Sequence, residues 1–353
     1  MKKLIVGAVL AGLAFGGLGM GPATGQNGLP VIDLRQAGEI PEQFGSGPDD
    51  HFWNISGLCI DSEGDVYVAD RGWAKIIELD RQGRFLRSFG RKGQGPGEFS
   101  ADTGSSLDVT IGNDGFLYIY DGRGSRLSRF DRAGKFLDGM PLKSGSGSPA
   151  VNSKGEVHLV ANGDDLISVF SRPGALPARK FFPASLHFDD PFLKPAAAMA
   201  RSMNADSLLL SMAANDRLVA VSNESLKAFV FGPDSREIRS FDVGDESFRA
   251  ALRKRYDALI KSMIEKGMTP PRARILPFGL RLAPGNRLLL STFNSERKAT
   301  DVLVYSLEGR LEAQLRFPEG IRSPIAANDR GELFGVREDA TIVRFHPPFP
   351  GTR

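Results

Sequence analysis

Cysteine is almost missing from this sequence of 353 residues, because Cys59 is the only one. A single cysteine forms no disulfide within the chain, so the stability of the fold must come from its hydrophobic core. Cys59 lies in the apolar segment GLCI. We therefore interpret it as a small buried residue and not as a reactive thiol.

An excess of one charge is missing as well. The chain has 45 basic residues, of which Lys2 and Lys3 lie at the extreme N-terminus, and 42 acidic residues. A chain this close to neutrality has no bulk attraction to nucleic acid or to anionic lipid, so we expect no nucleic-acid partner. A local basic patch is compatible with this composition.

Long apolar runs are absent after residue 25. The first segment has two lysines, then an apolar stretch rich in Ala, Gly and Leu, and then small residues. This order predicts a secretory signal peptide at 1–25, cleaved near Gln26, and a single mature domain at 26–353 without a transmembrane segment. We expect a secreted or periplasmic protein, and an uncleaved anchor helix is the alternative.

Two segments of the chain repeat each other. Residues 61–86 align without a gap with residues 112–137 at an offset of 51. The recurring pairs are Gly64 with Gly115, Tyr67 with Tyr118, Asp70 with Asp121, Asp80 with Asp131, Gly83 with Gly134, and Phe85 with Phe136.

Four weaker copies follow, from Asn152, Ala214, Ala283 and Ile325. Each copy has strands separated by Asp/Gly turns, and four strands for every roughly 40 to 60 residues are typical of a propeller blade. The sequence therefore predicts an all-β, six-bladed β-propeller. We expect residues 29–40 to form a strand that completes blade six and closes the ring.

The segments GDVYVAD, IIELDRQGRFLRSFG and GQGPGEF resemble the NHL-repeat family and the related six-bladed propellers of exported bacterial proteins. The resemblance is close over blades one and two and weak after blade three. It implies the shape of a propeller. NHL-like repeats mostly bind proteins, RNA or glycans, so the family implies a fold more than an activity.

Two segments depart from the strand pattern. FGRKGQGPGEF, residues 89–99, has the close glycines of a phosphate loop, but no helix follows it. We interpret it as a connector between the outer strand of one blade and the inner strand of the next. Residues 245–271 have apolar side chains at helical spacing and predict a helical insertion, at about 245–268, between blades four and five. This helix either contributes to a ligand site or plugs the channel.

The longest loops are expected on one rim of the ring, and loops on rigid scaffolds often carry function. Asp70 and Asp121 end equivalent strands there, and Asn162, Asn223 and Glu338 lie one position beyond the aligned Asp. A ring of such oxygen atoms suits calcium. Asp and Asn also bond their own backbone in turns, so both interpretations are open.

Basic residues and a tryptophan gather in blades one and two. Arg offers forked donors for a carboxylate or phosphate, and Trp offers a flat face for a sugar or a peptide side chain. A solvated charged rim is the alternative. The predicted ligand-binding patch consists of Asp70, Arg71, Trp73, Arg91, Asp121, Arg123 and Arg126, with Lys75 and Lys92 beside it.

Histidine is scarce, which bears on catalysis. Lyases and amidating enzymes of this architecture need several inward imidazoles. The chain has four histidines: His51 lies beside two aspartates, His158 takes the strand position of two tyrosines, and the others are His187 and His346. No nucleophile elbow and no zinc spacing is found.

We therefore expect non-covalent binding of a peptide, protein or glycan, with no catalytic residue and no cofactor. The alternative is a calcium-dependent lactonase or a lyase that acts at the channel mouth. A purely architectural subunit of an envelope complex is a third class.

Overall fold

The computed structural model describes residues 30–48, 50–100, 106–142, 147–161, 164–183, 208–222, 226–244, 246, 249–250, 265, 279–294 and 297–349. The elements of this described part are strands, and they form six sheets.

Each sheet is one blade. Blade one consists of β3 (Ile55–Ile60), β4 (Val66–Asp70), β5 (Lys75–Leu79) and β6 (Phe85–Phe89). Blade two consists of β7 (Leu107–Ile111), β8 (Leu117–Asp121), β9 (Arg126–Phe130) and β10 (Phe136–Pro141). Blade three consists of β11 (Ala150–Val151), β12 (Val157–Val160), β13 (Asp165–Phe170) and β14 (Pro177–Pro183).

The second half of the ring is built in the same way. Blade four consists of β15 (Leu208–Met212), β16 (Leu218–Ser222), β17 (Lys227–Phe231) and β18 (Glu237–Asp242). Blade five consists of β19 (Gly279–Ala283), β20 (Arg287–Asn294), β21 (Ala299–Ser306), β22 (Leu311–Arg316) and β1 (Val31–Asp33). Blade six consists of β23 (Ile321–Ala327), β24 (Leu333–Arg337), β25 (Ile342–Phe345) and β2 (Gln36–Ile40).

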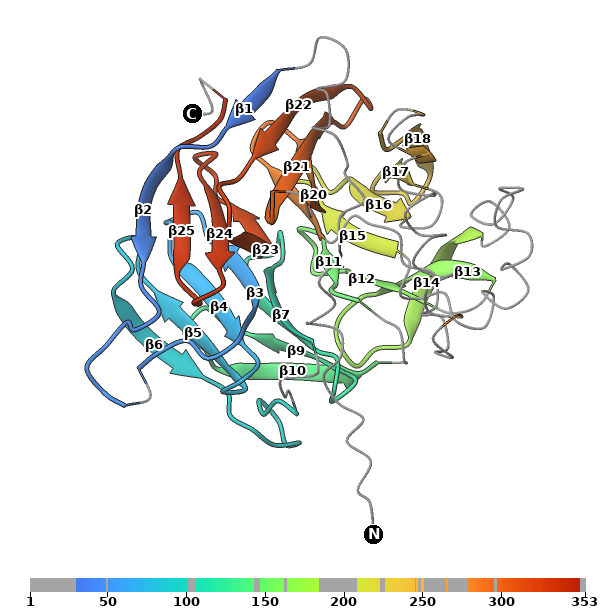
Figure 1. Cartoon of the computed structure of the whole chain (residues 1–353). Coiled ribbons are helices and arrows are strands. Elements are labelled where there is room, and N and C mark those ends of the chain that lie inside the picture. The colour runs from blue at the N-terminus through green and yellow to red at the C-terminus, as the bar shows by residue number, and fades with distance from the viewer. Residues whose placement is uncertain are drawn as a thin grey trace.

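The inner strands stand side by side around a central axis (Figure 1). β3 contacts β7 on one side and β23 on the other, β19 lies between β23 and β15, and β15 contacts β11. Asn113 N–H donates to Val151 O at 3.1 Å, which joins the segment after β7 to β11. The circle is therefore closed, and the chain is a six-bladed β-propeller.

The repeated Asp/Gly pairs are the turns within the blades. Asp61 Oδ1 accepts hydrogen bonds from the backbone N–H groups of Glu63, Gly64 and Asp65 at 2.8–3.0 Å. Gly64 has a φ of 98°, which side chains rarely adopt, so glycine is required three residues after the aspartate. Asn328 makes the same turn in blade six with Arg330 and Glu332. The repeat in the sequence is thus a repeat of turn chemistry.

The N-terminal segment divides between two blades, whereas the sequence predicted one strand over 29–40. β1 pairs in parallel with β22 of blade five, with Val31 opposite Gln314. β2 pairs antiparallel with β25 of blade six, with Ile40 opposite Ile342. In Figure 1 the two blue strands lie against the red ones.

Between these two strands the side chain of Leu34 is buried in the core that blades five and six share. Two successive polar residues, Arg35 and Gln36, follow Leu34 in the sequence, but nothing local indicates that the two parts pair with different sheets.

The predicted helical insertion falls almost entirely outside the described residues. Glu246, Arg249, Ala250 and Glu265 are described and have helical backbone, but no helix is among the elements of the described ranges. The segment 1–29 is also outside them, so the signal peptide stays a prediction. A search of the described residues finds no helix with the length and hydropathy to cross a membrane.

Candidate functional site

Two glycine-rich loops lead into the inner strands of blades one and two, and they have the same construction. Loop 42–54 precedes β3 and loop 89–100 precedes β7. Phe52 and Phe99 are fully buried at the ends of these loops. Asp50 accepts a hydrogen bond from Gly47 N–H at 2.8 Å, and Glu98 accepts one from Gly95 N–H at 2.8 Å.

An acidic side chain of each loop therefore takes up a backbone donor that a phosphate would need. The loop 89–100 joins the outer strand β6 to the inner strand β7, so the connector interpretation is confirmed.

Asp70 fastens loop 42–54 to the turn between β4 and β5. Its carboxylate accepts hydrogen bonds from the backbone N–H groups of Trp53 at 2.7 Å, Asn54 at 3.1 Å, Gly72 at 2.9 Å and Trp73 at 3.1 Å. The side chain has no exposed surface. Asp70 therefore holds two backbone segments together through its own oxygens.

Asp121 makes the equivalent contact in blade two. Its carboxylate accepts hydrogen bonds from Ser100 N–H at 2.7 Å and Gly124 N–H at 2.9 Å. The residue is 1% exposed. Like Asp70, it contributes to the predicted patch through the backbone that it positions.

Both tryptophans of the protein lie on the Asp70 framework. The rings of Trp53 and Trp73 pack edge to face with their centroids 5.2 Å apart. Trp73 Nε1–H donates to His51 O at 3.0 Å, and its ring also contacts the His51 ring at 5.3 Å. Trp53 remains 56% exposed. We call His51, Trp53, Arg71, Trp73 and Lys75 the tryptophan cluster.

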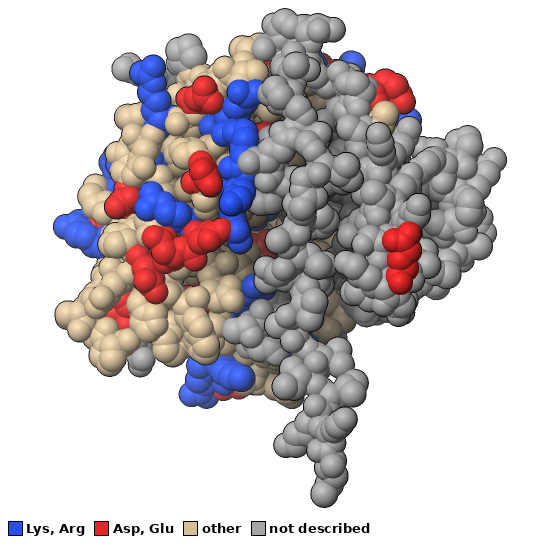
Figure 2. All heavy atoms as spheres, viewed as in Figure 1, with Lys and Arg blue, Asp and Glu red and all other residues tan. Residues whose placement is uncertain are grey.

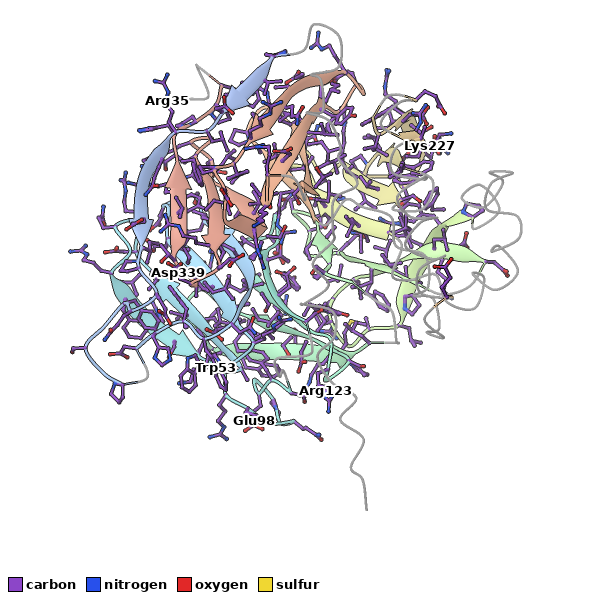
Figure 3. The ribbon with its side chains drawn as sticks, in the orientation of Figure 1. Arg35, Trp53, Glu98, Arg123, Lys227 and Asp339 are labelled. Carbon is purple, nitrogen blue, oxygen red and sulfur yellow. The ribbon has the colours of Figure 1, made fainter. Side chains whose placement is uncertain are left out.

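The basic members of this cluster come from blade one. Lys75 Nζ lies 5.9 Å from the centre of the Trp73 ring, and Arg71 Nε donates to Asn54 Oδ1 at 3.0 Å. Trp53, Glu98 and Arg123 lie in the same part of the view in Figure 3. On the described part of the face in Figure 2, basic and acidic side chains are interspersed. The charge of this face alone therefore does not indicate which kind of partner would bind it.

The arginines of blade two support the second loop. Arg126 Nη1 donates to Gln94 O and Gly95 O, each at 2.8 Å. Arg91 pairs with Glu98 Oε1 at 2.7 Å. The N–H of Gly95 and the Arg91 guanidinium hold the pKa of Glu98 below its usual value. Arg91 and Arg126 thus belong to the loop scaffold, and Arg123 is exposed beside them.

The structure thus gathers Asp70, Arg71 and Trp73 around one loop, and Arg91, Asp121, Arg123 and Arg126 around the equivalent loop. Sequence reasoning left Trp53 out of the patch. The two loops could have been compared in the sequence: Phe52 is followed by Trp53, whereas the equivalent Phe99 is followed by Ser100. The aromatic residue after Phe52 is therefore not part of the repeat.

The carboxylates proposed for a calcium ring do not converge. Asp70 and Asp121 bind backbone N–H groups, and Glu338 pairs with Arg322. Asn162 and Asn223 lie outside the described residues. Within the described ranges, no group of three or more His, Cys, Asp or Glu side chains could hold a metal ion.

The central channel contains a polar contact between opposite blades. Asp108 of β7 and Arg281 of β19 approach each other, with Oδ2 and Nη2 3.6 Å apart, although their blades face one another across the axis. Ser148 Oγ donates to the same carboxylate oxygen. Burial, and secondarily Asp108, raises the pKa of Cys59, which keeps this neighbouring thiol protonated.

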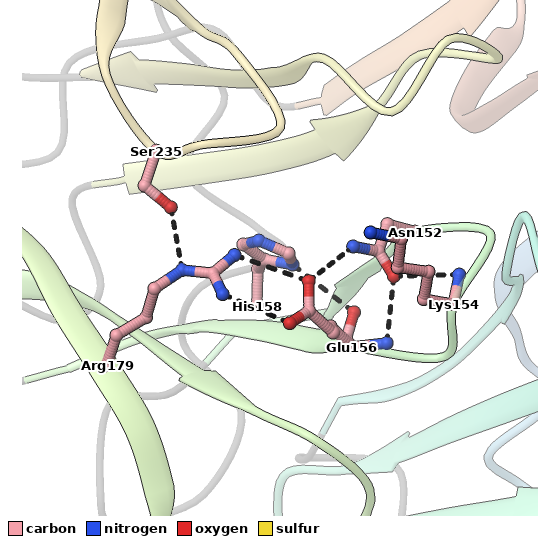
Figure 4. A network of polar contacts seen from close by, with 6 residues as sticks. All are labelled: Asn152, Lys154, Glu156, His158, Arg179 and Ser235. Carbon is pink, nitrogen blue, oxygen red and sulfur yellow. Dashed lines mark hydrogen bonds and ion pairs between the residues drawn. The ribbon is translucent and has the colours of Figure 1, made fainter.

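His158 is a structural residue. It is 4% exposed in β12, where burial and the nearby Arg179 lower its pKa. Figure 4 shows the network around it, in which Arg179 binds Glu156 at 3.0 Å and Ser235 of the next blade at 2.9 Å. This agrees with the packing role expected from its strand position. His51 and His346 belong to other blades, and His187 lies outside the described residues.

Fold and site together define the chain as a six-bladed β-propeller with an aromatic cluster on one rim. No family model matches the sequence. The curated "Probable peptidyl-alpha-hydroxyglycine alpha-amidating lyase" of Caenorhabditis elegans is 28% identical over 113 residues, which are 31% of this chain and 31% of that protein. The alignment thus spans about a third of the relative's length.

Two solved lyase structures are similar to this chain at low identity. The virginiamycin B lyase of Staphylococcus aureus is 14% identical, with a TM-score of 0.47 over 82% of this chain and 80% of that chain. A streptogramin B lyase is also 14% identical, with a TM-score of 0.47 over 90% of this chain and 93% of that chain.

Proposed function

We propose that the protein is an exported, NHL-like β-propeller that binds a peptide, protein or glycan through the loops of blades one and two. The observation that carries this proposal is the tryptophan cluster. The export part rests on the N-terminal segment alone, with its lysines, apolar stretch and small residues.

The tryptophan cluster has the properties of a binding surface. Trp53 exposes 56% of its surface to solvent, while most large apolar side chains of the described chain are buried. Its backbone N–H is fixed by Asp70 and its ring by Trp73, so little conformational entropy is lost when a ligand covers it. Exposed tryptophans that are held in this way are typical of residues that dominate a binding energy.

Binding is tested with the intrinsic fluorescence of the purified protein. Both tryptophans lie in the cluster, so a ligand that covers it changes the emission without any label. We expect one class of a panel of glycans and peptides to change the emission in a saturable manner.

The Trp53→Ala variant should then weaken binding at least ten-fold, measured by calorimetry. The control is Leu176→Ala, since Leu176 is 88% exposed in a turn of blade three. Equal affinity of the Trp53→Ala variant and the wild type would remove the cluster from the ligand site.

A second candidate is a lyase or a calcium-dependent lactonase that acts at the channel mouth. The 113-residue similarity to the amidating lyase and the polar Asp108–Arg281 contact in the channel favour it. It predicts cleavage of a peptidyl-α-hydroxyglycine substrate, or of a lactone in the presence of calcium. Turnover that is lost in Arg281→Gln and kept in Trp53→Ala would establish the enzyme and displace the binding proposal.

A further inference from the structure

A cavity of about 330 Å³ lies where the ring closes, between blade six and blade one. It is lined by β2 and β25 of blade six and by the turn that joins β5 to β6 of blade one. Its floor is apolar, from Ile40, Phe334 and Ile342. Two arginines, Arg81 and Arg344, line it as well.

The equivalent space between blades one and two is filled by a network of side chains. Arg132, in the turn of blade two, pairs with Asp61 at 3.4 Å and lies over the ring of Tyr67 at 5.5 Å. Tyr67 donates to Glu78 at 3.2 Å, and Glu78 pairs with Arg87 at 2.8 Å. The turn arginine Arg132 thus pairs with an acid and lies over a tyrosine, and the tyrosine hydroxyl binds a second ion pair, Glu78–Arg87.

Strand register identifies the same positions in blade six. In the sheet of blade six, Phe334 lies opposite Arg344, and Arg344 lies opposite Gly38. In blade one, Tyr67 lies opposite Glu78 and Glu78 opposite Arg87 in the same way. The turn position of Arg132 is that of Arg81, and the position of Asp61 is that of Asn328.

Each change at these positions removes negative charge or volume. Blade six has Asn328 at the position of Asp61, Phe334 at that of Tyr67, Arg344 at that of Glu78, and Gly38 at that of Arg87.

Arg344 therefore has a more distant counter-charge than the charged residues at its position elsewhere. In blade two the same position is Arg129, and the next strand supplies Asp138, which accepts two hydrogen bonds at 2.6 and 3.0 Å. In blade six the next strand supplies Gly38, where a side chain would approach the Arg344 guanidinium to 3.3 Å. The nearest acid to Arg344 is Glu332, at 3.9 Å from Nε.

The other charges around the cavity do not compensate Arg81. Glu39 is bound to Arg337 at 3.4 Å and to Gln36 at 3.2 Å. Glu332 accepts a hydrogen bond from Asn328 at 2.7 Å. Among the described residues, the Arg81 side chain has no ion pair. The cavity is thus lined by two arginines, by Glu39, whose charge is paired with Arg337, and by an apolar floor.

We propose that this cavity binds a small organic carboxylate, whose anionic group gives Arg81 the counter-charge that Asp61 gives Arg132 and also binds Arg344, which lines the same cavity. Guanidinium groups hold a carboxylate with paired, charge-assisted hydrogen bonds. The apolar part of the ligand lies on Ile40, Phe334 and Ile342. At ≈30 Å³ for each water, the cavity has the room of about ten waters, which suits a single aromatic ring with its carboxylate.

The probe is 4-fluorobenzoate, followed by ¹⁹F NMR on the full chain. We expect saturable binding with a Kd on the order of 1 mM, a usual affinity for a ligand of this size. Arg81→Gln and Arg344→Gln should each weaken it about ten-fold. Asn328→Asp restores the aspartate that pairs with the turn arginine between blades one and two, so it should abolish binding and raise the Tm.

Three controls make the result decisive. Arg236→Gln changes an exposed arginine in the equivalent turn of blade four and should leave the Kd unchanged. Neutral 4-fluorobenzamide should not bind. Trp53→Ala should bind 4-fluorobenzoate as the wild type does, because this site is independent of the tryptophan cluster. The proposal is overturned if binding survives both arginine-to-glutamine changes, if the amide binds equally well, or if sulfate competes as strongly as the aromatic acid.

Discussion

The loops before β3 and β7 share one backbone framework and carry different side chains. In both, an aspartate at the end of the second strand binds the N–H of the residue that follows a buried phenylalanine, at 2.7 Å. In blade one that residue is Trp53, and in blade two it is Ser100. The turn that faces them presents Trp73 in blade one and Gly124 in blade two.

This comparison separates scaffold from surface within one molecule. The aspartates recur because blades one and two fix the loop to the second turn in the same way. The tryptophans do not recur, so the framework does not require them. Residues that the repeat does not explain are the better candidates for recognition, and by this criterion the tryptophan cluster is preferred over Asp70 and Asp121.

The largest expected effect comes from removing the shared aspartate. Asp70→Ala leaves four backbone donors without their acceptor and should cost about 4 kcal/mol of unfolding free energy. Asp121→Ala removes the acceptor of at least Ser100 N–H and Gly124 N–H among the described residues and should cost at least about 2 kcal/mol. Urea unfolding measures both. Asp70→Asn, which keeps one acceptor oxygen, should fall between Asp70→Ala and the wild type. A loss below about 1 kcal/mol in either alanine variant would show that the loops are not held in the way described.

An intermediate effect is expected at the glycine beneath Trp53. A Cβ at Gly72 would come within 2.7 Å of the Trp53 ring, so Gly72→Ala should push that ring away from Trp73 at a cost of about 1 kcal/mol. The tryptophan emission should move to longer wavelength as Trp53 becomes more exposed. The matched control is Arg123→Ala at the equivalent position of blade two, where Ser100 replaces the tryptophan. An unchanged spectrum for Gly72→Ala would contradict the packing of the cluster.

The smallest effect extends the comparison to blade three, where His158 takes the position of Tyr67 and Tyr118. Burial and Arg179 lower the pKa of His158 in the folded chain. As the pH falls through the unfolded value of about 6.5, the unfolded chain binds the proton first, so stability falls. The Tm should drop between pH 7.5 and 5.5 by more in the wild type than in His158→Tyr. Parallel pH profiles of the two proteins would exclude His158 as the cause.

The sequence allowed the ring to be predicted because its turns are local. Asp61 and Gly64 make their bonds within four residues, so their spacing is visible in the chain itself. The division of residues 29–40 could not be predicted. It depends on Arg316 and Phe345, which lie about 300 residues away and offer two different sheet edges.

The candidate site was predicted in part for the same reason. Trp73 and the basic residues were found because they follow the repeated Asp. Trp53 was missed, and Asp70 and Asp121 were given a ligand, because only the folded loops show which side chain faces solvent and which bonds the backbone. The cavity at the ring closure had no local pattern at all.

The sequence by itself determined the number of blades and the strand and turn pattern within them, since hydrogen bonds between near neighbours repeat with the residues that make them. Only the tertiary structure decided which sheet edges the N-terminal strands cover, which aspartates are buried, and which cavity Arg81 and Arg344 line together. Those features join residues far apart in the chain, and their energy depends on distances that exist only once the ring has closed.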